Sequence, residues 1–261
     1  MIIELIGPAG CGKTTAARHL DRLLRGHTPA LLGFEALERL DREIGERHLE
    51  RLPFRKRMRL LLPLFLRHPR IAIPVMVLAL VHGPPYKKRF RRAQRSLGHV
   101  LLMLRLRRLM PDMVVVADDG FTQTLWTMLV DSRALRGAWL IRLALASYHA
   151  VVEQRGLRFR IDDQTAAARV FGRESPGRFN RNAPDERRHA FGRWLAYHRR
   201  LVALLPEAVV AGTIDATGSE QDVARALADA IADLAGGAHT ASAPAETQTG
   251  ADTVLTPQRS P

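Results

Sequence analysis

A glycine-rich stretch, GPAGCGKTT, occupies residues 7–15 and lies directly between two segments of different periodicity. The apolar run Ile2 to Ile6 before it is typical of a strand buried on both faces, and a helical pattern follows from Thr14. The spacing GxxxxGK[ST] ends at Gly12, Lys13 and Thr14. A strand, a glycine loop and a helix in this order restrict the chain to a layered α/β fold, with the loop at the carboxyl end of a parallel strand.

Loops of this kind bind phosphates, because successive backbone N–H groups turn inward and the following helix directs its positive end at the anion. We expect Lys13 to reach the terminal phosphates and the Thr14 hydroxyl to ligate Mg²⁺. ATP and Mg²⁺ are therefore the predicted cofactors, and the absence of a guanine-recognising element favours ATP over GTP mildly. A glycine turn without a ligand is the weaker alternative. The predicted nucleotide-binding residues are Gly7, Ala9, Gly10, Cys11, Gly12, Lys13, Thr14 and Thr15.

Short apolar runs alternate with helical stretches along the chain, as in a parallel sheet with crossover helices. We expect a three-layer α/β/α fold of the P-loop NTPase type in one domain, residues 1–235. A helical insertion, residues 35–110, should separate the second and third strands. Residues 236–261 are poor in large apolar side chains and predict a disordered tail. The predicted strands are Ile2 to Ile6, Ala30 to Gly33, Met113 to Ala117, Trp139 to Ala144 and Ala208 to Ile214.

The most apolar part of the insertion runs from Leu60 to Val81, and Arg67, His68 and Arg70 interrupt it. Its longest clean run, Ile71 to Val81, falls short of the roughly 20 residues of a membrane-spanning helix. Two alternatives stay open: a helical hairpin packed on the core, or a surface that docks on a membrane or a membrane-bound partner. The basic stretch of residues 87–95 would suit lipid headgroups, a phosphate pocket or a solvated helix face.

The formal net charge of +14 would ordinarily suggest a nucleic acid as partner, but 36 of the 40 basic residues are arginines. Such a bias fits overall composition as well as function, so we expect no nucleic-acid partner. The single cysteine, Cys11, lies within the glycine loop, where it is expected to fill space rather than act as a nucleophile. One cysteine and no secretory signal predict a cytoplasmic protein. Homodimerisation stays open.

Two adjacent acidic residues, Asp118 and Asp119, close the predicted strand of residues 113–117. An acidic residue at the carboxyl end of a strand beside a phosphate loop is placed to meet Mg²⁺ or its water shell. We assign Asp118 to the metal and Asp119 to acceptor orientation or general base catalysis, with the reverse assignment open. Helix capping is the structural alternative for the pair.

The stretch from Glu153 to Asp163, EQRGLRFRIDD, resembles the lid of thymidylate kinases, whose pattern RGxxxRI is followed by an acidic residue. The resemblance places a lid at residues 153–185 and implies that Arg155 and Arg160, with Arg158 between them, stabilise the transferring phosphoryl group. Further similarities are the strand end at residues 214–216 and an RAQ element, which implies substrate binding by Arg92 and Gln94.

The chain departs from that family at the acceptor side. Ala9 stands where thymidylate kinases carry an acidic residue, and Asp118, Asp119 and Gly120 replace an Asp-Arg-Tyr signature. A carboxylate in place of an arginine favours a hydroxyl acceptor over a phosphate, although Arg92 and Arg95 could still receive a phosphate. We therefore expect a phosphotransferase acting on a nucleotide, nucleoside or other small acceptor. The alternative is an ATP-binding regulatory or assembly ATPase that docks on a membrane through its apolar insertion.

Overall fold

A parallel sheet forms the centre of the protein. The computed structural model describes residues 1–23, 31–32, 52–82, 86–109, 111, 113–130, 136–172 and 184–240. Five parallel strands pair in the order β2-β3-β1-β4-β5, so β1 lies in the middle and all carboxyl ends meet at one edge. The strands are β1 (Ile2–Ile6), β2 (Leu31–Leu32), β3 (Val114–Ala117), β4 (Gln154–Arg160) and β5 (Val210–Asp215).

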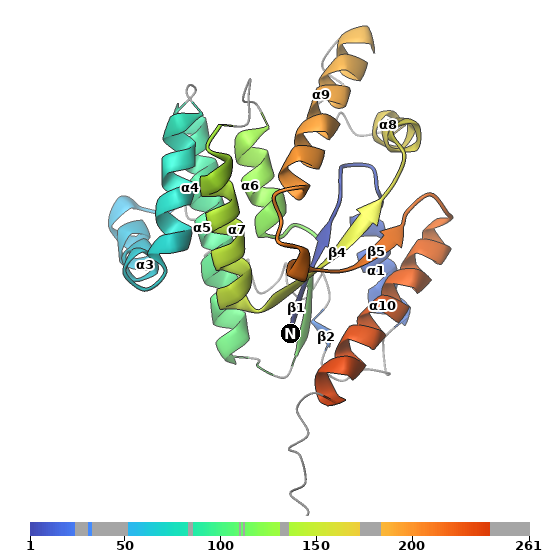
Figure 1. Cartoon of the computed structure of the whole chain (residues 1–261), viewed down its shortest axis with the longest axis horizontal. Helices are drawn as coiled ribbons and strands as arrows, with labels where there is room; N and C mark the ends of the chain where they lie inside the picture. The colour runs from blue at the N-terminus through green and yellow to red at the C-terminus, as the bar shows by residue number, and fades with distance from the viewer. Residues whose placement is uncertain are drawn as a thin grey trace, which may run out of the picture.

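Helices cover both faces of this sheet (Figure 1). One face packs on α1 and α10, and the other faces a thicker helical layer that includes α4 to α7. Helices α8 and α9 lie beyond the carboxyl edge. The helices are α1 (Lys13–Leu23), α3 (Phe54–Arg67), α4 (Pro69–Val81), α5 (Tyr86–Leu109), α6 (Phe121–Leu129), α7 (Ala138–Val152), α8 (Asp163–Phe171), α9 (Pro184–Val202) and α10 (Glu220–Thr240), with a 3-10 turn at Glu207–Val209.

Strand β1 is buried along its whole length, and its side chains divide between the two faces with the period of two that a strand imposes. Ile3 and Leu5 pack in the core formed with α1 and α10. Ile2 and Ile6 pack in the larger core on the opposite face. Glu4 lies between Ile2 and Ile6 on the same face of the strand, so its carboxyl group enters the larger core.

The predicted strands at residues 2–6, 30–33, 113–117 and 208–214 are confirmed as β1, β2, β3 and β5, with small changes in their bounds. The predicted strand Trp139 to Ala144 is wrong, because these residues belong to α7. Alanine and leucine dominate this run and are strong helix formers, and the run continues apolar for a helix length. The strand that lies beside β1 is instead β4, within the segment predicted to be a lid.

The described part of the insertion is helical, as predicted, and lies between β2 and β3. Helix α4 is packed against α5 and α7, with its buried side chains in the larger core. Helix α3 meets α4 at His68 and keeps several large apolar side chains exposed. The packed hairpin is therefore confirmed for α4, and α3 lies on the outside. Residues 33–51 lie outside the described part.

Among the described residues, no single helix is both long and apolar enough to cross a membrane. The pair Arg55–Arg67 and Pro69–Val81 passes the same test of length and composition together, but it is bent by 119°.

The predicted boundary of the tail at residue 236 is wrong, because α10 continues to Thr240. Alanines in this region favour helix, and the helix propagates past Gly236 and Gly237. The rest of the predicted tail, residues 241–261, and the predicted lid residues 173–183 lie outside the described part.

The packing of α4 can be tested with two leucines that differ only in burial. We expect Leu78→Ala to lower the free energy of unfolding by about 2 to 5 kcal/mol, because its side chain is fully buried against the rest of the core. Leu80→Ala, on the same helix but 52% exposed, should change it by less than about 0.5 kcal/mol. Urea denaturation measures both, and equal effects would show that α4 does not pack as described.

Candidate nucleotide and acceptor site

The glycine loop leaves the carboxyl end of β1 and turns into α1 through two residues in the left-handed region, Gly10 with φ 84° and Gly12 with φ 86°. Side chains other than glycine are strained there, so the glycines are what allow the turn. Gly7 meets a close contact, since an added Cβ would lie 2.7 Å from Cys11 Sγ. Cys11 is buried, in agreement with its predicted role as a filling residue.

Lys13 lies inside the curve of this loop. Its Nζ donates to the carbonyl oxygens of Gly7 at 2.5 Å and Pro8 at 3.2 Å, and it lies 3.6 Å from Cys11 Sγ. The side chain is nearly buried. An ammonium group held on loop carbonyls is placed to move onto the oxygens of a bound phosphate, which is the role that the sequence predicts for Lys13.

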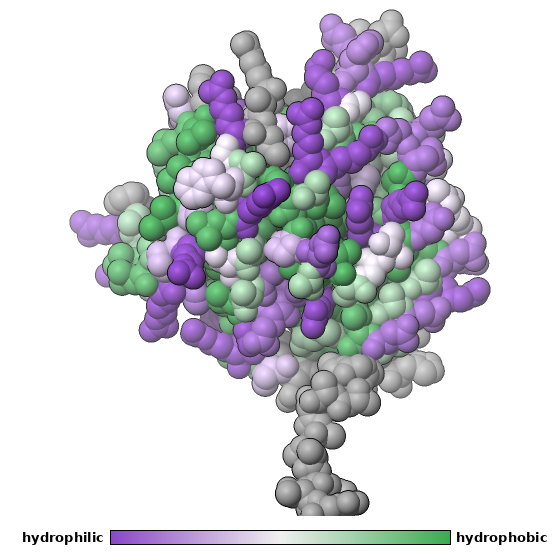
Figure 2. Space-filling view, in the orientation of Figure 1, coloured by the Kyte–Doolittle hydropathy of each residue, from purple (hydrophilic) through white to green (hydrophobic). Residues whose placement is uncertain are grey.

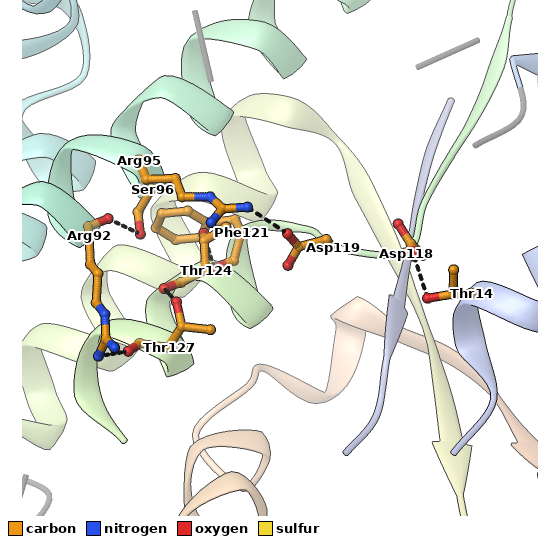
Figure 3. Close-up of polar contacts among 9 residues, drawn as sticks. All are labelled: Thr14, Arg92, Arg95, Ser96, Asp118, Asp119, Phe121, Thr124 and Thr127. Carbon is orange, nitrogen blue, oxygen red and sulfur yellow. Dashed lines mark hydrogen bonds and ion pairs between the residues drawn. The ribbon is translucent and has the colours of Figure 1, made fainter. Parts of the chain in front are cut away.

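Thr14 and Asp118, 104 residues apart, meet beside the loop (Figure 3). The Thr14 hydroxyl donates to Asp118 Oδ2 at 2.8 Å, and Asp118 is 8% exposed at the end of β3. A hydroxyl and a carboxylate are the hard oxygen ligands that Mg²⁺ takes when nucleotide phosphates and water complete its octahedron. The two predicted metal residues are therefore brought together, and they fit this ion. Among the described residues, no group of three or more His, Cys, Asp or Glu side chains could hold a metal ion.

Asp119 points away from its neighbour. Figure 3 shows the carboxylate of Asp118 directed at Thr14 and that of Asp119 directed at Arg95 of α5. Arg95 Nη2 lies 3.4 Å from Asp119 Oδ2, and both side chains are partly exposed. The sequence left open whether a carboxylate or an arginine stands on this side, and the structure has both, paired with each other.

The other residues predicted on the substrate side have structural partners. Arg92 donates to the carbonyl oxygen of Thr127 at 2.5 Å, which ties α5 to α6 (Figure 3). Gln94 accepts a hydrogen bond from Arg57 of α3 at 3.1 Å. Neither of these two contacts joins the Asp119 side of the site, which Arg95 of α5 reaches.

Residues 154–160 form β4, so the predicted lid is wrong at this segment. The alternation of Leu157 and Phe159 with arginines is the period of a strand, and both apolar side chains pack on α1 and α10. Arg155 pairs in register with Ile3 and donates to the carbonyl oxygen of Ala208. Because strands rise about 3.3 Å per residue, Arg155 lies about 13 Å along the sheet from the level of the loop's first residue.

Arg158 and Arg160 lie at the other end of β4, beside the loop. They line a pocket with Pro8 of the loop and with His198 and Arg199 of α9. Burial first, and then the nearby charges of Lys13, Arg158 and Arg199, lower the pKa of His198 to about 3. His198 is therefore neutral mainly because it is buried, and the three nearby cations add a positive potential that suits an anionic group.

Arg169 of α8 borders the loop from the opposite side and was not predicted. Its guanidinium donates to the carbonyl oxygens of Ala216 and Gly218, and it lines a pocket with Gly12 and Thr15. The sequence carried a signal for its helix, because Asp162 caps α8 by accepting from the Thr165 N–H at 2.8 Å. The acidic residue of the RGxxxRI match is therefore a helix cap.

Glu4 was also not predicted, and it joins the sheet to the Asp pair. Its Oε1 accepts from the Thr122 N–H at 2.8 Å, and its Oε2 accepts from the Thr122 hydroxyl at 3.1 Å and from Gln154. Thr122 lies in the first turn of α6, four residues after Asp118. The carboxyl group is fully buried, and burial raises its pKa to about 7. Glu4 thus holds the start of α6, and with it the turn that presents Asp118 and Asp119.

We expect Glu4→Gln to remove a pH dependence from stability. Glu4 has its ordinary pKa, 4.5, in the unfolded chain and about 7 when folded, so its stabilising contribution is complete below pH 4.5 and is lost as pH rises from there through 7. The variant should match the wild type near pH 4 and exceed it near pH 8 by on the order of 3 kcal/mol. Gln154 Oε1, which makes no hydrogen bond, can accept from the new amide if Gln154 turns over. Urea denaturation across pH measures the difference.

Two histidines act in the opposite direction but do not obscure this test. Burial lowers the pKa of His149 to about 4 and, with nearby cations, that of His198 to about 3. Each histidine therefore makes the folded protein less stable as pH falls below 6.5. Their effect is common to both proteins and cancels in the difference. Parallel stability curves for wild type and Glu4→Gln would contradict the raised pKa.

The close approach of Glu4 to the turn predicts a strict requirement for glycine at position 120. A Cβ there would lie 2.2 Å from Glu4 Cδ, so Gly120→Ala must push the carboxyl group off Thr122. We expect a loss of about 1 to 3 kcal/mol in unfolding free energy. Gly192→Ala is the matched control, because its Cβ would meet nothing within 4 Å on α9, and it should be neutral or stabilising. Thermal unfolding of both variants measures the difference, and a Gly120→Ala protein as stable as the wild type would refute the contact.

Comparison with known protein families and curated proteins found no match, so a function can be argued only from the geometry of the site.

Proposed function

We propose that the protein is an ATP- and Mg²⁺-dependent phosphotransferase with the fold of P-loop kinases. The observation that carries the proposal is the 2.8 Å hydrogen bond between Thr14 and Asp118 at the mouth of the glycine loop. It joins the last residue of the phosphate-binding motif to an acidic residue at the end of the neighbouring strand. This pairing is what a magnesium-nucleotide site needs, whereas a plain glycine turn needs neither group.

The residues around the loop divide the work by charge. Lys13 would hold the terminal phosphates, and Thr14 with Asp118 would hold Mg²⁺, which supplies electrostatic stabilisation of the transferring group when bound. Arg160 and Arg158 end the strand beside Pro8, where their charge would act on an anionic group near the loop. Arg169 reaches the other side of the loop, next to Gly12 and Thr15. Cations thus lie on both sides of the loop.

The acceptor would bind near Asp119 and Arg95. A carboxylate there can orient a hydroxyl group and take its proton, and the partly exposed guanidinium can contact an anionic substituent. An acceptor with a hydroxyl group, with or without a neighbouring phosphate or carboxylate, fits this pair. A nucleotide, a nucleoside and another small hydroxyl compound all belong to this class.

The test is ADP release measured against a panel of such acceptors. We expect an acceptor to stimulate release, and Lys13→Ala and Asp118→Asn to lower the stimulated rate roughly a hundredfold or more. Arg160→Ala and Arg155→Ala form a matched pair on one strand. Arg160→Ala should lower the rate, whereas Arg155→Ala should leave it near wild type, because Arg155 lies at the level of Ile3.

An equal loss from both arginine variants would favour the lid interpretation over the strand. ATP turnover that no acceptor raises would contradict the phosphotransferase and support the alternative, an ATP-driven regulatory or assembly protein. ATP binding that survives Lys13→Ala unchanged would refute the nucleotide site itself.

A further inference from the structure

The excess of basic over acidic residues in this protein is concentrated in one segment. Residues 51–111 contain 16 of the 40 Lys and Arg residues and none of the 26 Asp and Glu residues. The rest of the chain therefore has 24 basic and 26 acidic residues and is nearly balanced. An overall preference for arginine cannot explain this, because it would spread the excess along the whole chain. The described part of the segment is α3, α4 and α5.

Helix α3 presents both charge and apolar surface to the outside. Met58, Leu62 and Leu66 recur every four residues and are 41%, 53% and 72% exposed. This spacing places them along one side of the helix. Arg55 and Arg59 are exposed on the same side, one turn apart. We call these five residues the α3 face. In Figure 2, green and purple side chains lie next to one another over α3, at the left of the view.

The corner between α3 and α4 extends the same surface. Exposed Arg67 and Arg70 flank His68 there, and Ile73 is 50% exposed one turn further along α4. Burial first, and then the charges of Arg108 and Arg67, lower the pKa of His68, so Arg108 of α5 also acts at this corner. The potential at the corner is therefore positive.

We propose that the α3 face docks on the surface of an anionic membrane, with its apolar side chains among the acyl chains and its arginines at the headgroups. Large apolar side chains flanked by arginines are what an interfacial helix needs, since each supplies part of the binding. Nucleic acid would use the arginines but would leave three exposed aliphatic side chains without a partner. The proposal is independent of the phosphotransfer proposed above.

The place of α3 in the fold allows this contact. Helix α3 packs on α4 and lies at the outer side of the helical layer, with the sheet and α10 beyond that layer (Figure 1). The glycine loop and Asp118 lie at the carboxyl edge of the sheet. Docking through α3 would place the protein on a membrane by one flank, without using the residues of the candidate site.

The test is co-sedimentation of the full-length chain with vesicles of phosphatidylcholine alone or mixed with phosphatidylserine. We expect binding to the mixed vesicles only, weakened by salt, because exposed charges are screened. Arg55→Gln with Arg59→Gln should weaken binding roughly twenty-fivefold, at roughly fivefold per basic residue. Leu62→Ser with Leu66→Ser should weaken it by a similar factor or more. All four side chains are solvent-exposed, so the variants should keep the wild-type melting temperature.

Two controls match these variants on other surfaces. Arg18→Gln with Arg225→Gln removes the same charge from exposed positions on α1 and α10, and Trp139→Ser removes a 67% exposed apolar side chain from α7. Both should bind as the wild type does. Wild-type protein that stays in the supernatant with both vesicles would overturn the proposal, as would equal losses in variants and controls. Binding to duplex DNA that the double serine variant retains, without vesicle binding, would assign the surface to nucleic acid instead.

Discussion

The hydrogen bonds from Thr122 to the buried carboxyl group of Glu4 connect the centre of the sheet to the residues that would do chemistry. Glu4 lies in the middle of the central strand, on the face opposite α1. It holds the start of α6, which begins immediately after Asp118, Asp119 and Gly120. The turn that carries both carboxylates is thereby anchored to the central strand of the sheet. Removing the contact would leave Asp118 attached to β3 but would release the start of α6, which follows Asp119 and Gly120 directly.

A buried carboxyl group with a pKa near 7 is a costly way to hold a turn, and the surrounding groups reduce that cost. Three donors surround its two oxygens, and Gly120 has no side chain that would displace it. Apolar packing could not replace this arrangement, because the N–H of Thr122 is buried and needs an acceptor. The same contact explains why glycine follows the two aspartates.

The parts of the site that could be predicted from the sequence are those where local pattern and chemistry agree. GPAGCGKTT required a strand before it and a helix after it, and the apolar run that ends at Ala117 placed Asp118 at a strand end. The local sequence does not determine which strands are neighbours, but a parallel sheet brings the carboxyl ends of all its strands to one edge. The meeting of Thr14 and Asp118 follows from that rule.

The failures have equally specific causes. A run of alanine and leucine at residues 139–144 fits a strand or a buried helix, and only the packing of α7 decides. In β4 the alternating pattern LRFR was visible, but the RGxxxRI resemblance led to a lid interpretation. Glu4 was hidden because one acidic residue in an apolar strand has no local partner. Its partners Thr122 and Gln154 are 118 and 150 residues away.

The net charge also illustrates what the sequence can and cannot predict. The net charge of +14 is uninformative as a total, because a bias toward arginine would produce it without any function. Its distribution is informative, since all of the excess falls in residues 51–111 while the rest of the chain is nearly balanced. The arginines beside the loop, Arg158, Arg160 and Arg169, belong to the balanced part, which also contributes Asp118 and Asp119. The two uses proposed for positive charge, local stabilisation of phosphate and attraction to an extended anionic surface, would therefore lie on different elements of one fold.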